Sequence, residues 1–264
     1  MSLPGALKHI LTLRTPNALA SPGLSKLAPV LRTTWCEAAA QSAYGYAILL
    51  QRSDLRPVDD RTAKAALMRE TGLKCAVFVG VPKVINSLAG LTTRLDEDVK
   101  AKLNQEPLRT LHNERAGIEQ VTTRGKKLFA SVYDPHTEKL LAKLGSYHPD
   151  FPGFIVANEY GALLSDPPPE SCALDGRVGR TLTSVAGVAC LRASGGVGPQ
   201  LISHVYGLLK AREYDGGGHT PPAVGPLEGD DWLASAEGAT WIIEVVDRLV
   251  DALHGSGELS RTKL

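Results

Sequence analysis

Residues 174–209 read LDGRVGRTLTSVAGVACLRASGGVGPQLISHVYGLL, and this stretch decides the fold. Its first part repeats apolar residues at helical spacing, which predicts a helix that begins at Leu174-Asp175 and ends at Gly195-Gly196. Its second part begins after a proline and carries another apolar stripe with a single histidine, His204. The stretch therefore predicts two consecutive helices joined by a glycine turn, the second of which bears the histidine.

The composition of the whole chain favours an all-α protein. Aromatic residues make up only 5% of the 264 residues, and this scarcity suits helix packing better than a sheet rich in tyrosine and phenylalanine. The 29 basic and 28 acidic residues leave a formal net charge of +1, which favours neither nucleic acid nor an anionic membrane as a partner. No apolar run reaches the roughly 18 residues that a membrane-spanning helix needs. We therefore expect a helical protein without a membrane or nucleic-acid partner.

The same apolar spacing predicts helices in the rest of the chain. Those that precede residue 174 are expected at 24–50, 59–79, 82–91, 128–147 and 151–164, with charged, solvated helix and loop over 97–127. The break at Gly80-Val81-Pro82 predicts a tight hairpin between the helices on either side of it. A last amphipathic helix, from Trp232 to Leu253, is expected either to dock on the body or to help an oligomer form.

Breaks in composition divide the chain into a basic N-terminal segment, a helical domain and a C-terminal region, at 1–26, 27–214 and 215–264. The C-terminal region holds a Gly/Pro-rich loop, the last helix and a tail. Within the helical domain, SDPPPES at 165–171 cannot continue a helix, because consecutive prolines hold the chain extended. This segment predicts a stiff link between two helical halves, 27–164 and 172–214.

The cysteines are far apart in sequence and form no CxxC pair: they are Cys36, Cys75, Cys172 and Cys190. Such spacing indicates neither a disulfide framework nor a zinc site, and it favours an intracellular protein. His204 has no histidine or carboxylate three or four residues away along its helix. We therefore expect no metal ion.

Both ends of the chain carry possible targeting signals. Residues 1–36 contain no Asp or Glu but several basic residues, which fits either a mitochondrial transit peptide or an ordinary basic helix. The last three residues, Thr262-Lys263-Leu264, differ at one position from the peroxisomal Ser-Lys-Leu signal, and a peroxisomal import receptor would read them. A peroxisomal location is the expectation, with mitochondrial and cytoplasmic locations as alternatives.

Three stretches resemble the carboxymuconolactone decarboxylase and AhpD-like superfamily. CAVFVGVPKVINSLAGL at 75–91 resembles its helix, Gly-x-Pro turn and asparagine-containing helix, and residues 174–209 resemble its core. VYDPHTEKLLAKLGSYHPDFPGFIVANEYGALLSD at 132–166 is similar to the lead-in helices of many fungal members. The resemblance spans about residues 27–210 and implies an AhpD-like helical bundle with two related halves. It also implies a homo-oligomer, either a trimer or a hexamer.

The resemblance fails at the redox motif of the AhpD-like peroxidases, Glu-x-x-Cys-x-x-Cys-x-x-x-His. Alignment on His204 puts Val197 and Gln200 at the two cysteine positions and Ser194 at the glutamate. Dithiol peroxidase chemistry is therefore not expected, because it needs one thiolate to attack and a second to resolve. Cys190 is left as a lone redox candidate.

The decarboxylase branch of the superfamily lacks the cysteine pair and implies a different chemistry. Its members act on carboxylated lactones, which implies a cofactor-free lyase or isomerase for a small acidic or lactone-like metabolite. His204 and Lys74 are the expected catalytic residues, with His204 as the proton shuttle. The expected substrate-binding residues are Arg180, Arg192, Tyr160 and Glu159.

Two other interpretations stay open. A histidine on an apolar helix face is often a packed core residue, and the chain would then be a catalytically degenerate binding or scaffold protein. A buried cysteine usually packs as a small apolar residue, but an accessible Cys190 would support weak thiol peroxidase activity.

Overall fold

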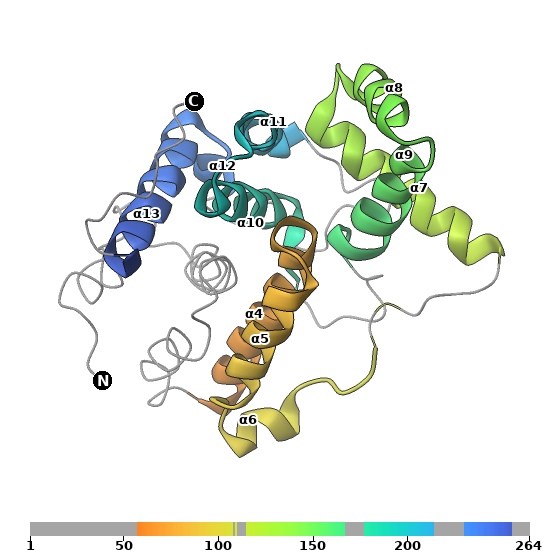
Figure 1. Ribbon diagram of the computed structural model, residues 1–264. Helices are drawn as coiled ribbons and strands as arrows, with labels where there is room; N and C mark the ends of the chain where they lie inside the picture. The colour runs from red at the N-terminus through yellow and green to blue at the C-terminus, as the bar shows by residue number, and fades with distance from the viewer. Residues whose placement is uncertain (1–56, 108, 110–114, 167–176, 214–229, 255–264) are drawn as a thin grey trace.

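The computed structural model describes residues 57–107, 109, 115–166, 177–213 and 230–254 (Figure 1). Every regular element in these ranges is helical, which confirms the predicted all-α class. The two related halves stay a prediction. The larger elements are α4 (Val58–Val79), α5 (Val81–Thr92), α6 (Glu97–Lys102), α7 (Arg115–Tyr133), α8 (Thr137–Tyr147), α9 (Phe151–Phe154), the π-helix η3 (Ile155–Leu164), α10 (Gly179–Ser194), α11 (Gly198–Leu209), α12 (Asp230–Leu233) and α13 (Ala236–His254).

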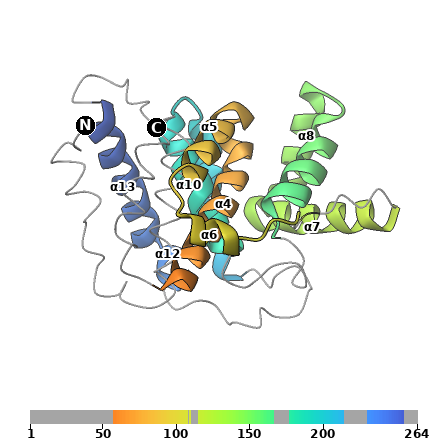
Figure 2. The same ribbon diagram turned by 90° about the horizontal axis from the view of Figure 1, so that it is seen from below.

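The hairpin of α4 and α5 forms where the sequence predicts it. Helix α4 ends at Gly80, whose φ of 85° lies in the left-handed region that favours glycine. The Gly80 amide donates to the carbonyl of Ala76 at 3.1 Å, and Pro82 lies in the first turn of α5. The two helices consequently lie side by side, as both views show (Figure 1, Figure 2).

Helix α10 is the most deeply buried element of the described residues. All its residues from Thr181 to Leu191 are buried, and it packs against α4, α11 and α13 (Figure 1). The predicted start at Leu174-Asp175 is wrong, because the helix begins at Gly179. The φ of Gly179 is 72°, a conformation that does not continue a right-handed helix from residues before it. Residues 174–176 lie outside the described ranges.

Helices α7 and η3 cross at two glycines. A Cβ atom on Gly125 would collide with the carbonyl oxygen of Val156, and one on Gly161 would collide with the carbonyl oxygen of Val121. The crossing therefore requires glycine on both helices. The described part of 97–127 is helix and loop, as expected: α6, the loop 103–107 and the first part of α7. The helix expected at 128–147 is wrong as a single element, because Asp134-Pro135 divides it into α7 and α8.

The C-terminal helix docks on the body of the protein, one of the two outcomes that its amphipathic pattern allows. Leu233, Ile242 and Val246 are buried in the same apolar cluster as α10. The predicted single helix is two helices, because Ser235 caps a new start: its Oγ accepts the amide of Gly238 at 3.1 Å. Among the described helices, none combines the length and apolar character needed to cross a bilayer.

The N-terminal segment, the SDPPPES link after Asp166, the loop at 215–229 and the terminal Thr-Lys-Leu all lie outside the described residues. The corresponding expectations for a transit peptide, an interdomain link and a peroxisomal signal therefore stay predictions.

Candidate active site

A small cavity lies where α4, α7, η3, α10 and α11 meet, and His204 is on its wall. Its volume is about 10 Å³, which is enough for about one water molecule. No organic metabolite fits into it in this conformation. The residues that line it are Phe78, Leu128, Val132, Tyr160, Leu164, Arg180, Thr183, Ser184 and His204.

The imidazole of His204 is buried, with 6% of the residue exposed. Its Nε2 lies 3.3 Å from the hydroxyl oxygen of Tyr133, and its ring makes a T-shaped contact with the ring of Phe78, with the ring centroids 5.3 Å apart. Its Nδ1 faces Gly187, where an added Cβ would lie 3.0 Å away. Burial lowers the pKa of His204 to about 4, and the positive charge of Arg180 contributes to the shift. The ring is consequently neutral at pH 7.

Two tyrosines extend the hydrogen-bonded chain from His204. The hydroxyl oxygens of Tyr133, on α7, and Tyr160, on η3, lie 3.0 Å apart. Burial raises the pKa of Tyr133, and it raises that of Tyr160 well above the ordinary range of a phenol. Both hydroxyls therefore stay protonated, and the chain from His204 to Tyr160 carries no net charge at pH 7.

Arg180 holds three helices together beside the cavity. Its Nε donates to Ser131 Oγ on α7 at 2.9 Å, and Nη2 donates to the carbonyl of Gly207 on α11 at 2.9 Å. Nη2 also donates to the carbonyl of Ser131 at 3.3 Å, and Nη1 donates to the hydroxyl of Ser184, one turn along α10. The guanidinium thus brings a fixed positive charge to the cavity wall.

Lys74 lies behind the cavity wall. Only 1% of the residue is exposed, and Nζ pairs with Asp166 Oδ1 at 2.6 Å and donates to Thr183 Oγ1 at 2.9 Å. Asp166 Oδ2 in turn accepts the amide of Gly179, at the start of α10. Thr183 lines the cavity and Lys74 does not, so this lysine supports the wall and joins α4 to α10.

Arg192 and Glu159 are not brought to the cavity. Arg192 forms a two-pronged ion pair with Asp247 on α13, with Nε and Nη2 at 2.6 and 2.8 Å from the carboxylate oxygens, and this bonding raises its pKa. Glu159 is half-buried, and its burial raises its own pKa. Its charge contributes to the raised pKa of Tyr133 and of Tyr160. Of the four expected substrate-binding residues, the structure therefore brings Arg180 and Tyr160 to His204.

Cys190 lies in a different part of the core. It is 0% exposed and packs with Cys75 and Val84, and none of these three residues lines the cavity, although Phe78 contacts both the cluster and the cavity. A thiol in this position is shielded from dissolved peroxide, so its burial favours the packing interpretation.

Sequence reasoning missed Tyr133, Ser131 and Ser184. One signal for Ser184 was present, because it follows Arg180 by four residues and so shares a helix face with it. Tyr133 and Ser131 come from α7, and only the packing of α7 against α11 places them near His204. Within the described ranges, no three His, Cys, Asp or Glu side chains gather into a group that could hold a metal ion.

Comparisons with family models, with curated proteins and with solved structures return no match to this chain. The resemblance to the carboxymuconolactone decarboxylase and AhpD-like superfamily therefore stays a prediction.

Proposed function

We propose that this chain is a cofactor-free, carboxymuconolactone decarboxylase-like lyase or isomerase that acts on a small acidic or lactone-like metabolite, with His204 as its proton shuttle. The observation that carries the proposal is the contact between the neutral imidazole of His204 and the hydroxyl of Tyr133, beside the fixed charge of Arg180. The class of substrate comes from the family resemblance and from that positive charge, which favours an anion.

A neutral imidazole suits proton transfer at carbon. In an isomerisation, Nε2 takes a proton from a carbon next to the carbonyl and returns it to another carbon of the resulting dienolate, so that the protein ends unchanged. In a decarboxylation, carbon dioxide leaves, the bonding electron pair stays on the dienolate, and the proton delivered to carbon through His204 is replaced from solvent. Arg180 stabilises the anionic oxygen in both reactions.

Substrate entry requires a change of conformation. The cavity has room for about one water molecule, and a lactone needs several times that volume. Phe78 contributes a partly buried side chain to the cavity wall in contact with the imidazole, and its displacement enlarges the space beside His204. The proposal therefore includes movement of side chains around His204 when substrate binds.

Exchange of carbon-bound protons with deuterium tests the proposal. The purified full chain is incubated in D₂O with a panel of carboxylated five-membered unsaturated lactones, and both deuterium incorporation and loss of substrate are followed by NMR. The wild type is expected to incorporate deuterium or to turn over one panel member, and His204→Gln is expected to reduce the rate by about 100-fold or more. His148→Gln, at an exposed histidine on the surface, is the matched control and is expected to keep the wild-type rate.

Two results would contradict the enzymatic proposal. One is full turnover by His204→Gln when the variant keeps the wild-type circular dichroism spectrum. The other is a wild type that exchanges and converts nothing in the panel.

A second candidate, a catalytically inactive binding or scaffold protein, is favoured by the size of the cavity. Every polar side chain around His204 already has a partner inside the protein, as expected for a network that specifies the core. This function predicts no exchange and no turnover. It also predicts that Tyr133→Phe changes the free energy of unfolding and has no effect on any reaction.

A further inference from the structure

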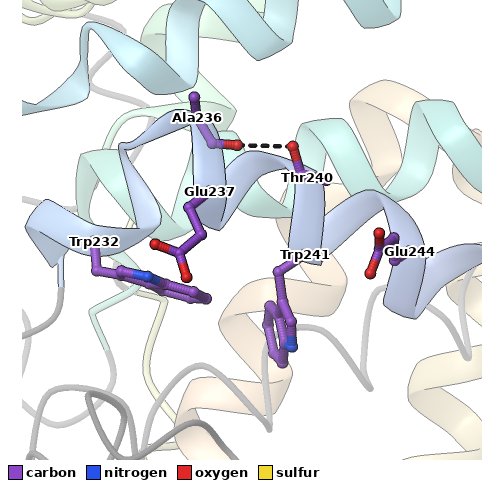
Figure 3. A pocket seen from close by; sticks show the side chains of 6 residues that line it. All are labelled: Trp232, Ala236, Glu237, Thr240, Trp241 and Glu244. Carbon is purple, nitrogen blue, oxygen red and sulfur yellow. Dashed lines mark hydrogen bonds between the residues drawn. The ribbon is translucent and has the colours of Figure 1, made fainter.

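A second pocket among the described residues lies on the face formed by α12 and α13 (Figure 3). Its volume is about 450 Å³, and it shares no residue with the cavity at His204. Its lining residues are Trp232, Ala236, Glu237, Thr240, Trp241 and Glu244. Neither the sequence motifs nor the proposed function accounts for it.

The helical spacing and one glycine explain why these side chains gather. Residues 237, 240, 241 and 244 follow an i, i+3, i+4, i+7 pattern and so share one face of α13. Trp232 joins them because Gly238 lets α12 pack closely against α13. A Cβ on Gly238 would collide with the carbonyl oxygen of Trp232 and lie 2.8 Å from the Cα of Leu233.

The two indoles form adjoining walls. Their ring centroids are 5.7 Å apart and their planes are inclined by 64°. Figure 3 shows the carboxylate of Glu237 beside the indole of Trp232 and that of Glu244 on the far side of Trp241 from Trp232. Both glutamates are exposed, whereas both tryptophans are half-buried against the apolar core. The indoles are therefore held in place while the carboxylates face solvent.

The charges of the pocket favour a cation. Its described lining includes two carboxylates and no basic side chain, and the Thr240 hydroxyl donates to the carbonyl of Ala236 at 2.8 Å. The faces of aromatic rings carry partial negative charge, so they attract a cation above them. The indole N–H groups are the only other donors among these side chains, which is a poor set for binding an anion.

The aromatic walls further favour a methylated cation over a primary amine. Indole faces accept hydrogen bonds weakly, so a primary ammonium against them would regain hydrogen bonds only from the two exposed carboxylates, where water competes. A trimethylammonium group is weakly hydrated, and its methyl groups make dispersion contacts with both rings. We propose that the pocket formed by Trp232 and Trp241 with Glu237 and Glu244 binds a trimethylammonium group.

Calorimetric titration of the full chain with choline tests the proposal. The control ligand is 3,3-dimethyl-1-butanol, a neutral isostere that has the shape of choline without its charge. Choline is expected to bind with a dissociation constant of about 1 mM or lower, and the isostere at least about tenfold more weakly. A trimethyllysine derivative, Nα-acetylated and C-terminally amidated, is titrated in parallel. The tighter of the two cations then identifies the source as a free metabolite or a modified lysine.

Three variants locate the binding to this pocket. Trp241→Leu and Glu237→Gln are each expected to weaken choline binding, the first by about tenfold or more through loss of an aromatic wall. Glu138→Gln removes an exposed carboxylate on α8 and is expected to leave binding unchanged. Glu237→Gln keeps both rings, so it tests the site even if Trp241→Leu fails to fold.

The proposal is overturned if choline does not bind saturably, if the neutral isostere binds as tightly as choline, or if Glu237→Gln and Glu138→Gln have equal effects. None of these outcomes bears on His204, so the two proposals can fail separately.

Discussion

The hydroxyl of Tyr133 lies 3.3 Å from Nε2 of His204 and thereby joins the last residue of α7 to the middle of α11. The Nδ1 of the imidazole faces Gly187, and the ring of Phe78 packs nearly perpendicular to it. Contacts from three other helices therefore fix one orientation of a ring that carries no charge at neutral pH.

Gly187 gives His204 the space that it occupies. An alanine Cβ at this position would lie 3.0 Å from Nδ1 of His204 and 3.1 Å from Cζ of Phe78, both closer than ordinary contact. We expect Gly187→Ala to lower the free energy of unfolding by about 1–3 kcal/mol, because overpacking outweighs the gain in helix propensity. Urea denaturation measures this change. The control is Gly153→Ala in α9, where nothing lies within 4 Å of the added Cβ, and it is expected to be neutral or slightly stabilising.

The buried imidazole makes stability depend on pH. The pKa of His204 is about 4 in the folded protein and 6.5 ordinarily, so between these values the unfolded chain binds more protons. Above pH 6.5 the histidine is neutral in both states and imposes no pH-dependent cost on folding. As the pH falls from 6.5 towards 4, protonation of the unfolded chain lowers the free energy of unfolding by up to about 3 kcal/mol.

His204→Gln isolates this contribution, because glutamine does not titrate and the other groups are common to both proteins. We expect the difference in the free energy of unfolding between wild type and variant to shrink by about 3 kcal/mol from pH 7 to pH 4. Urea denaturation at several pH values measures it. A difference that stays constant over this range would show that the imidazole is accessible to protons in the folded state.

Removing Asp166 from its ion pair with Lys74 is expected to lower the free energy of unfolding more than removing Lys74. Asp166→Asn leaves the ammonium of Lys74, which is 1% exposed, without its carboxylate, at a cost of about 3 kcal/mol or more. Lys74→Met removes the buried charge and leaves Asp166, whose side chain is 29% exposed and reaches water, so its cost is smaller. A double-mutant cycle by urea denaturation tests the order. A larger cost for Lys74→Met would contradict it.

The sequence predicted the helices best where glycine and proline end them. Gly80 and Gly195-Gly196 stop helices at the expected residues, because a positive φ or a missing side chain acts locally. The start of α10 was predicted wrongly because the sign of φ at Gly179 depends on contacts such as the one from its amide to Asp166. That contact joins residues 13 apart in the chain, beyond the reach of helical periodicity and capping patterns.

The candidate site could be predicted only in part, because the sequence shows which residues share a helix but not how the helices pack. Arg180 and Arg192 lie on one helix, and both were expected to bind substrate. Twelve residues separate them, which is about 18 Å along the axis and about 120° around it, so the two side chains cannot serve one small site. Helical geometry alone could have excluded Arg192, whereas Tyr133 required knowledge of how α7 packs on α11.

The crossing of α7 and η3 at Gly125 and Gly161 limits how the surroundings of His204 can vary. The backbones touch there, so neither helix can slide along the other without a collision. Tyr133 and Tyr160 belong to these two helices, so the close crossing helps to fix the spacing of their hydroxyl groups. Side chains around the imidazole can therefore be exchanged while this part of the helical framework keeps its geometry.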